Sequence, residues 1–512
     1  MNESIYITTP IYYVNDKPHV GHAYTSIACD SLARFYKILG RDVFFLTGTD
    51  EHGLKIQQSA KEKDIDTQFF VDKMSKNFQE LTNILMLTNN DFIRTTSEQH
   101  KNGARHFWTS LSEKDEIYLD KYSGWYSIRD EAYYQENELI EGRAPTGSSV
   151  DWVEEASYFF RLSKWQQPLL DFYSQNPNFV HPQSRFNEVI KFVENGLRDL
   201  SVSRTSFDWG VSVPQHEGHV MYVWLDALVN YITALGYPDS SSDRLNRYWP
   251  ATYHVVGKDI LRFHAVYWPA FLMAVGMQPP KQIVAHGWWT VEKEKMSKSV
   301  GNVVDPIDII SEFGLDSFRY FLLREVHFGN DGDFSRDAVI SRINSELANN
   351  IGNLINRVYA MTIKNFDSKI PPYGPLLESE QAIQEKIFHI IEEYKNHFVN
   401  VEFSKALGSV VELVSISNKY IDTLKPWSLA KENQTERLST ILRLMLETIR
   451  IVVTMTYPVM PLISIKVLKS LSCFIDEKSL DYESLRNIKF LSDGSTLNKL
   501  DLLFPKIDKN LG

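Results

Sequence analysis

The first fifty residues follow the order strand, loop, helix, strand, and this order constrains the fold more than any other feature. Residues 5–7 form a β-prone run that stops at Pro10. Apolar residues then recur at helical spacing over 28–39, which predicts an amphipathic helix ending at Gly40. A second β-prone run occupies 42–47. Two strands joined by a helix within ~45 residues form a βαβ unit, so we predict an α/β fold with a parallel sheet.

Composition narrows the class of protein. The chain has 512 residues, enough for roughly three to four domains at ~150 residues each. Its two cysteines, Cys29 and Cys473, exclude a disulfide scaffold and any cysteine-rich zinc site. The formal charge of −11 argues against a protein that coats nucleic acid through its overall field, but it leaves open an RNA partner bound by a local basic surface. We expect no DNA partner. The apolar run 451–465 is too short for the ~20 residues of a membrane span. Without a signal peptide, the chain is expected in the cytoplasm and not at a membrane.

Further along, the pattern changes twice. Short aromatic-rich runs between glycines and charged turns over 117–219 predict a small, partly β insertion. The α/β rhythm resumes with strands at 253–257 and 283–286, separated by a helix from 259 to about 275. From about 338 onward, helical periodicity dominates and predicts a bundle.

The first candidate site is the motif His19-Val20-Gly21-His22, which opens the first predicted helix. Backbone N–H groups and the helix dipole favour an anion at this position. Two imidazoles one turn apart add donors for phosphate oxygens, and Gly21 leaves room for a nucleotide. The alternative is a pair of helix-capping histidines that bind no ligand.

The second candidate site is the run KMSKS, which extends from Lys295 to Ser299 after the strand at 283–286. Lys295 and Lys298 can converge on a triphosphate and neutralise the charge that develops as pyrophosphate leaves. The alternative is a solvated basic turn. No P-loop motif is present, so a nucleoside triphosphate would have to be bound in another way.

Together the two motifs resemble the HIGH and KMSKS signatures of the class I aminoacyl-tRNA synthetases, with Val20 in place of isoleucine. Four further segments, 8–15, 47–53, 222–227 and 257–260 with His264, resemble the methionyl-tRNA synthetase family. The resemblance extends from residue 5 to about residue 505. It implies a Rossmann-like catalytic domain with an inserted connective-peptide domain, followed by an α-helical bundle.

The resemblance also implies domain boundaries. The catalytic domain would occupy 1–116 and 220–287, around an insertion at 117–219. The KMSKS loop and a stem-contact region would occupy 288–337, and the anticodon-binding domain 338–512. Relatives often carry cysteine-bound zinc in the insertion, but 117–219 contains no cysteine. We therefore expect no structural zinc and no protein metal site.

Site residues follow from the resemblance position by position. Asp50 would hold the ammonium group of methionine, Asp259 would lie near the ATP ribose, and Arg204 would help to neutralise the phosphates. His19, Gly21, His22, Lys295 and Lys298 would bind ATP. The methionine side chain would be enclosed by Ile11, Tyr13, Trp224, Ala227, Leu228, Tyr231, Ile260 and His264. Aromatic faces suit a polarizable thioether, although ordinary core packing is an alternative for each aromatic residue and for His264.

In the helical region, Trp427 after Pro426 resembles the tryptophan with which the family reads the anticodon. Asn353 and Arg357 resemble the helix facing it, with Asn349 and Asn350 as alternatives for the base-contacting asparagine. Unpaired bases stack on aromatic and guanidinium planes, which suits this set. A core tryptophan is the alternative for Trp427.

The implied activity is that of a methionine–tRNA ligase, which uses ATP with Mg²⁺ to form methionyl-adenylate and charges tRNA(Met). The alternatives are a class I synthetase for another amino acid, a small nucleotidyltransferase, and a catalytically inactive tRNA-binding homologue. An insertion of ~100 residues is too short for the editing domain of the isoleucine, valine and leucine enzymes. We expect a monomer, because the sequence contains no dimerising β-barrel extension after the bundle.

Overall fold

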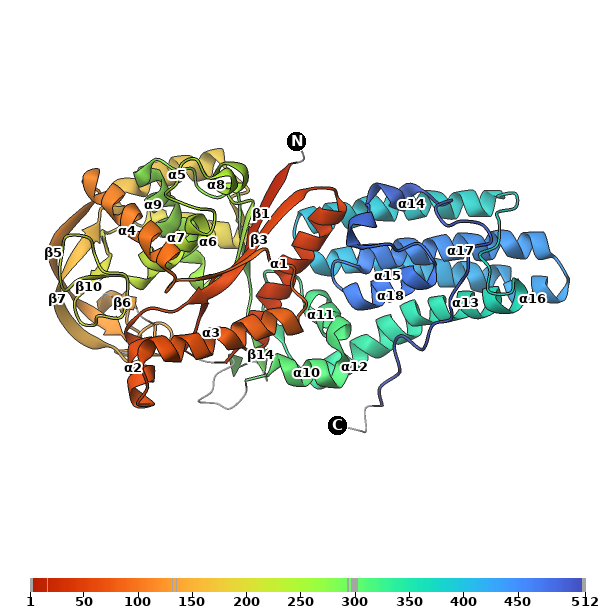
Figure 1. Cartoon of the computed structure of the whole chain (residues 1–512), viewed down its shortest axis with the longest axis horizontal. Helices are drawn as coiled ribbons and strands as arrows, with labels where there is room; N and C mark the ends of the chain where they lie inside the picture. Colours follow the sequence, from red (N-terminus) through yellow and green to blue (C-terminus); the bar gives the residue numbers. More distant parts are fainter. Residues whose placement is uncertain are drawn as a thin grey trace. The chain divides into compact units, whose positions relative to one another are not determined.

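The computed structural model describes residues 3–15, 17–130, 132–134, 136–291, 294–295 and 303–508, coloured along the sequence in Figure 1. These residues form two compact units. The sheet unit comprises Ser4–Pro18 and Val43–His286, and the helical unit comprises Met1–Glu3, His19–Asp42 and Gly287–Gly512.

A seven-stranded sheet organises the sheet unit. Its strands run in the order β2-β3-β1-β12-β13-β8, and β4 pairs with β3. β12 pairs in parallel with β1 and β13, β8 pairs in parallel with β13, and β3 pairs in parallel with β2 and β4. The strands are β1 (Ser4–Thr8), β2 (Tyr12–Tyr13), β3 (Asp42–Asp50), β4 (Asp91–Arg94), β8 (Val180–His181), β12 (Tyr253–Gly257) and β13 (Ile283–His286). The predicted α/β class with a parallel, Rossmann-like sheet is confirmed.

The central strands β1, β3, β12 and β13 are buried along nearly their whole length, as expected when helices cover both faces of a parallel sheet. Phe107 and Trp268 are among the helical residues that pack into the same core. The helices of the unit are α2 (Leu54–Glu62), α3 (Thr67–Ile84), α4 (Glu98–Glu113), α5 (Gln166–Gln175), α6 (Gln183–Glu194), α7 (Val223–Thr233), α8 (Asp243–Tyr248) and α9 (Trp268–Val275).

The region 117–219 contains a four-stranded antiparallel sheet of order β6-β5-β7-β9. Its strands are β5 (Ile117–Ser127), β6 (Ala132–Tyr134), β7 (Asp151–Phe160) and β9 (Leu200–Ser201). The middle of the region differs from the expected insertion, because α5 and α6 flank β8, which pairs with β13 of the parallel sheet. A two-residue strand carries no periodic signal, and its place in the sheet depends on distant partners: the carbonyl oxygen of Phe179 accepts from Ile283 N–H at 2.7 Å.

In the helical unit, α1 (Val20–Ile38) packs with the C-terminal helices. Phe35 of α1 stacks on Phe398 of α14 (Glu378–Val399), with ring centroids 4.5 Å apart. As predicted, α1 ends before Gly40, whose φ of 71° is favourable only for glycine. Figure 1 shows α13, α15, α17 and α18 lying along one another. The helices after α1 are α10 (Pro306–Phe313), α11 (Leu315–Arg324), α12 (Arg336–Arg342), α13 (Asn353–Asn365), α14, α15 (Phe403–Leu424), α16 (Pro426–Lys431), α17 (Thr435–Thr456) and α18 (Pro461–Ser470).

A buried ion cluster joins three parts of the helical unit. The Asp30 carboxylate of α1 accepts from Arg34 at 2.8 Å and from Arg319 of α11 at 2.6 Å. Arg319 also donates to the carbonyl oxygen of Val459, between α17 and α18. Burial alone would raise the pKa of Asp30, but the two guanidinium groups hold it below its ordinary value.

Residues 471–508 are mostly irregular, unlike the helical run expected there, because Gly494, Pro505 and several Asp and Ser residues favour turns over a helix. Three short strands, β14 (Trp289–Val291), β15 (Glu294–Lys295) and β16 (Gly332–Asp333), form a sheet of order β15-β14-β16. Among the described residues, no helix combines the length and apolar character that a membrane crossing requires.

Candidate functional site

The two histidines of the H-x-G-H motif cap the start of α1. Nδ1 of His19, the N-cap residue, accepts from the backbone N–H of Gly21 at 3.0 Å. Nδ1 of His22 accepts from the backbone N–H of His19 at 3.1 Å. The two rings lie 3.9 Å apart between centroids. The capping interpretation therefore describes what Nδ1 of each ring does.

Capping also fixes the tautomer of both rings and therefore the position of their protons. An imidazole that accepts at Nδ1 is neutral and carries its proton on Nε2. Burial and the neighbouring His19 lower the pKa of His22 well below its ordinary value, which keeps His22 neutral at physiological pH. Two Nε2–H donors at a helix N-terminus can bind the oxygens of a phosphate.

Gly21 is required by the ring of His19. A Cβ atom at position 21 would lie 2.8 Å from Cε1 and 3.0 Å from Nδ1 of that imidazole. The glycine thus makes room for the capping ring, a local reason that differs from the predicted approach of a nucleotide.

The lysine motif falls largely outside the described residues. Lys298 lies outside them, and only the backbone of Lys295 is described, paired with Thr290 of β14. The residues on both sides of the motif contact α1. Trp289 packs edge-on against Tyr24 at 5.8 Å between ring centroids, and the carbonyl oxygen of Val304 accepts from Val20 N–H at 3.1 Å. Both flanks of the lysine motif therefore lie beside the first turns of the helix that carries His19 and His22.

The predicted methionine-binding residues lie in the sheet unit. Tyr13 of β2 is the parallel register partner of Asp50, the last residue of β3. Both therefore lie at the carboxyl end of the sheet, where ligands bind in open α/β folds. Asp50 is buried and Tyr13 half-buried.

A second group of predicted pocket residues comes from α7 and from the π-helical segment Phe263–Tyr267 before α9. Nε2 of His264 lies 2.8 Å from the Tyr231 hydroxyl. Trp224 stacks on Phe263 with 3.7 Å between ring centroids, and its ring also meets His264 edge-on at 6.4 Å. The structure thus brings Trp224, Tyr231 and His264 together. π-Helical turns are frequent at functional sites.

The remaining predicted pocket residues lie on α7 or against the core of the sheet unit. Ala227 and Leu228 are buried on α7, and Ile11 and Ile260 pack partly buried against the same core. The carbonyl oxygen of Ile260 lies 2.9 Å from Nδ1 of His264. A carbonyl can only accept, so Nδ1 carries the proton and Nε2 accepts from the hydroxyl. Burial lowers the pKa of His264 to about 4, which the Ile260 carbonyl and Asp259 only partly offset.

Arg204 and Asp259 occupy contrasting environments. Arg204 in β10 (Ser203–Arg204) is buried, donates to Ser201 Oγ at 2.7 Å, and lies 4.3 Å from the Tyr222 ring centroid. Asp259 is exposed, directly after β12 at the carboxyl end of the sheet. An exposed carboxylate at that end suits a ribose hydroxyl, whereas the Arg204 guanidinium is held among aromatic and serine side chains.

Three residues near the pocket, His52, His100 and Asp226, were missed by the sequence analysis. His52 and Asp226 lie inside the segments 47–53 and 222–227, which resemble the family, so the sequence did contain a signal for these two residues. His100 of α4 had no local signal at all. The structure joins all three in one buried cluster.

The described residues contain no group of three or more His, Cys, Asp or Glu side chains that could hold a metal ion.

In the turn between β5 and β6 of the inserted sheet, hydroxyl groups surround the Asp130 carboxylate. It accepts from Ser148 at 3.0 Å and from Tyr134 at 3.2 Å, and Thr146 also donates to it.

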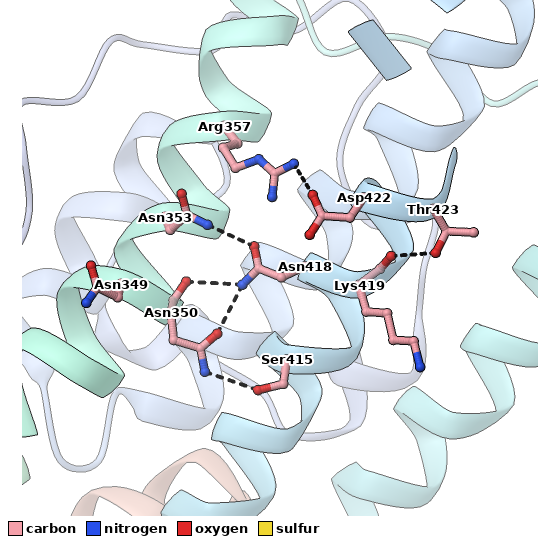
Figure 2. A pocket seen from close by; sticks show the side chains of 9 residues that line it. All are labelled: Asn349, Asn350, Asn353, Arg357, Ser415, Asn418, Lys419, Asp422 and Thr423. Atoms are coloured by element: carbon pink, nitrogen blue, oxygen red, sulfur yellow. Dashed lines mark hydrogen bonds and ion pairs between the residues drawn. The ribbon is translucent and has the colours of Figure 1, made fainter. Parts of the chain in front are cut away.

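The helical unit contains a polar surface pocket of about 510 Å³ between α13, α15 and the π-helical segment Ile343–Gly352. Figure 2 shows an amide network across it. Asn353 donates to Asn418 at 3.4 Å, and Asn418 donates to the Asn350 side chain at 3.0 Å. The lining residues are Asn349, Asn350, Asn353, Arg357, Ser415, Asn418, Lys419, Asp422 and Thr423.

Two of the three predicted anticodon residues, Asn353 and Arg357, line this pocket, and Arg357 lies next to the third, Trp427. Arg357 donates to Asp422 at 2.6 Å, and its guanidinium carbon lies 5.6 Å from the centroid of the Trp427 ring. Trp427 is 40% exposed, so the core-packing alternative is wrong for this residue. Asn353 lies one helical turn from Arg357.

Two family models together match most of the chain. A family model described as "tRNA synthetases class I (M)" matches residues 5–150 and 134–359. A second, described as "Anticodon binding domain of methionyl tRNA ligase", matches residues 370–511.

Individual relatives match the whole chain. The sequence is 49% identical over 519 residues to a methionine–tRNA ligase of Rickettsia felis, covering 99% of both chains. It is 46% identical over 506 residues to one of Rhizobium meliloti, covering 98% of both. Mycobacterium tuberculosis methionyl-tRNA synthetase in complex with methionyl-adenylate superposes with a TM-score of 0.95 at 45% identity, covering 98% of this chain and 100% of that one. The apo form of that enzyme gives a TM-score of 0.88 at 41% identity and covers 99% of both chains. The chain therefore belongs to the methionyl-tRNA synthetase family of class I tRNA synthetases.

Proposed function

We propose that this chain is a methionine–tRNA ligase that works in two steps. A carboxylate oxygen of methionine attacks the α-phosphorus of ATP, and the bond to the β-phosphate oxygen breaks, giving methionyl-adenylate and pyrophosphate. The 3′-terminal ribose hydroxyl of tRNA(Met) then attacks the activated carbonyl carbon and releases AMP. Activation needs no protein nucleophile, so positioning and electrostatic stabilisation supply the rate enhancement.

The phosphates are bound at the start of α1 in this proposal. The Nε2–H groups of His19 and His22 donate to phosphate oxygens, and Lys295 and Lys298 neutralise the departing pyrophosphate. Mg²⁺ arrives with ATP and is held mainly by phosphate oxygens and water. Arg204 and Asp259 are assigned to the phosphates and the ribose.

Methionine is bound by the sheet unit. The Asp50 carboxylate pairs with the ammonium group, and Tyr13 lies opposite it in the strand register. The thioether lies among Trp224, Tyr231 and His264, where the aromatic faces match its polarizability. The remaining wall is assigned to Ile11, Ala227, Leu228 and Ile260.

One observation carries the proposal. The segments on both sides of the lysine motif contact the first turns of α1, at Val20 and Tyr24, beside two imidazoles whose Nε2 atoms are donors. The M. tuberculosis relative, whose structure holds methionyl-adenylate, supports the proposed activation of methionine.

The helical unit recognises the tRNA in this proposal. The asparagine-lined pocket presents amide donors and acceptors, and Trp427 with Arg357 offers stacking planes for an unpaired anticodon base. The reaction is placed in the cytoplasm and the chain is taken to act as a monomer, which sedimentation at working concentration would check.

An amino-acid-dependent pyrophosphate exchange assay tests the function. With ATP and Mg²⁺, exchange should depend on methionine and on none of the other nineteen amino acids at equal concentration. Exchange with a different amino acid would establish a synthetase for that substrate. No exchange with any of them, combined with retained tRNA binding, would establish an inactive homologue.

A further inference from the structure

A buried carboxylate, Asp226, connects two of the segments to which methionine binding is assigned. Asp226 of α7 is 1% exposed, and both of its oxygens are used. Oδ2 accepts from Nδ1 of His52 at 2.6 Å, and Oδ1 accepts from Nε2 of His100 at 2.7 Å. Both interactions join residues more than 120 positions apart in the sequence.

The periodicity of α7 separates two faces. Residues 224, 227, 228 and 231 recur at helical spacing and form the face assigned to the methionine side chain. Asp226 and Thr233 lie on the opposite face, toward α4. There, His100 Nδ1 lies 2.9 Å from Thr233 Oγ1, and Gln99 donates to the carbonyl oxygen of Thr233 at 2.8 Å. Asp226 is thus part of the back of the helix whose front forms the pocket.

His52, one of the two partners of Asp226, lies close in sequence to Asp50, the residue assigned to the ammonium group of methionine. His52 follows Asp50 by two residues, directly after β3 ends. Glu51 between them is also anchored: Arg94 donates to its carboxylate at 2.7 and 2.9 Å, and Trp209 donates to its carbonyl oxygen at 2.7 Å. The backbone directly after Asp50 is therefore held twice, by the partners of Glu51 and by the bond from His52 to α7.

The carboxylate form of Asp226 suits this arrangement. Burial alone would raise its pKa, but the two imidazoles lower the pKa well below the ordinary value for aspartate. A buried, charge-assisted pair of hydrogen bonds is directional, so it specifies distance and angle better than apolar packing does.

We propose that Asp226 is a positioning residue for methionine, which sets the distance between the ammonium site at Asp50 and the side-chain pocket on α7 by holding His52 and His100. This inference rests on the proposed function. It implies that the cluster governs how strictly the enzyme selects the length of its amino acid.

The test compares Asp226→Asn with the wild type in methionine-dependent pyrophosphate exchange. Asparagine keeps the shape but turns one acceptor into a donor that faces an imidazole N–H. We expect KM for methionine to rise about 10-fold or more, with kcat and KM for ATP within about 3-fold, because ground-state and transition-state binding weaken together. The preference for methionine over its S-ethyl homologue ethionine should fall at least about 5-fold.

Paired substitutions separate positioning from folding. The amide of His52→Asn can replace Nδ1 as a donor and that of His100→Gln can replace Nε2, so both should stay near wild type. His52→Ala and His100→Ala should reproduce the KM increase. Glu116→Gln is the matched control, because Glu116 is a buried carboxylate in the same unit that accepts from Trp165 Nε1 at 3.0 Å. Its KM should not change even if its melting temperature falls.

Each result decides the inference. A wild-type KM and ethionine ratio in Asp226→Asn, or an equal KM increase in Glu116→Gln, would overturn it. If Asp226→Asn does not fold, His52→Ala against His52→Asn decides in its place, and equal behaviour of those two would overturn it. A wild-type enzyme without methionine-dependent exchange would instead overturn the proposed function, and this inference with it.

Discussion

The hydroxyl of Tyr231 donates to Nε2 of His264 across 2.8 Å, and the opposite ring nitrogen of that histidine determines the direction of this bond. Because Nδ1 donates to the carbonyl oxygen of Ile260, Nε2 can only accept. The Tyr231 proton is thereby directed at the imidazole. A hydroxyl oxygen and a neutral imidazole next to the Trp224 ring form a mildly polar wall, which suits a thioether better than a charged group.

The protonation of His264 gives a first prediction. We expect a neutral ring with its proton on Nδ1 down to about pH 4, observable by NMR of ¹⁵N-labelled histidine. The unfolded chain protonates this ring near pH 6.5, so stability falls as the pH drops from 6.5 toward 4. At pH 5 the loss is about 2 kcal/mol, from 1.5 pH units at 1.36 kcal/mol each. His264→Gln should remove that part of the acid sensitivity, and a ring that titrates near 6.5 would contradict the assignment.

Gly21→Ala should displace the capping ring of His19. The added Cβ would lie 2.8 Å from Cε1 of the imidazole, so the ring must leave its position. We expect adenylate formation to fall about 10- to 100-fold, with methionine affinity by calorimetry unchanged. Gly408→Ala is the matched control, because a Cβ there meets no atom within 4 Å and a helix interior favours alanine. Full activity of Gly21→Ala would contradict the role of His19.

Lys298→Ala tests the role assigned to the lysine motif. If Lys298 neutralises charge on the departing pyrophosphate, pyrophosphate exchange should fall about 100-fold or more while the dissociation constant for methionine stays the same. Lys386→Ala, on the exposed face of α14, should have no effect on either quantity. Comparable losses in exchange and methionine binding would count against the assigned role.

Trp427→Ala separates tRNA recognition from amino acid activation. Loss of one stacking surface is expected to cost about 1–3 kcal/mol, which raises KM for tRNA about 5- to 150-fold. Pyrophosphate exchange without tRNA should not change. Trp427→Phe should retain part of the affinity, because a smaller ring still stacks beside Arg357. An unchanged aminoacylation KM in the alanine variant would remove Trp427 from the tRNA site.

Glu380→Gln tests the stability of the helical unit. The carboxylate on α14 accepts two bonds of 2.7 Å from Arg437 of α17, and Tyr420 of α15 also donates to it. Burial would raise the pKa of Glu380, but these donors lower it to about 2. Its stabilisation is therefore complete above about pH 4.5 and is lost as the pH falls toward 2.

We expect Glu380→Gln to lower the free energy of unfolding by roughly 2–4 kcal/mol at pH 7, because the substitution leaves Arg437 without its ionic partner. Urea denaturation at pH 7 and pH 3 measures the effect. The difference between variant and wild type should shrink at pH 3, and a constant difference would contradict the ion pair as its source.

Much of the fold could be predicted because its signals are local. Strands at 253–257 and 283–286, the helix before Gly40 and the helices between 353 and 470 appear in the structure as expected, whereas residues 471–508 do not continue the expected helical run. The helix expected from 259 to about 275 is instead a 3₁₀ turn, a π-helical segment and α9 in succession. Periodicity detects the buried face of a helix but not its winding, so His264 and its contact with Tyr231 could not be placed in this way.

By itself, the sequence determined the class of fold, the family, and which motifs carry histidines and lysines, because these depend on residue type at short spacing. Tertiary structure alone decided that Nδ1 of His19 and of His22 caps α1, that Trp427 is exposed, and that Asp226 joins the segment after β3 to α4. The physical reason is that tautomer, burial and ion pairing depend on partners far away in the chain. His100 meets Asp226 across 126 positions, and no local pattern reports such a neighbour.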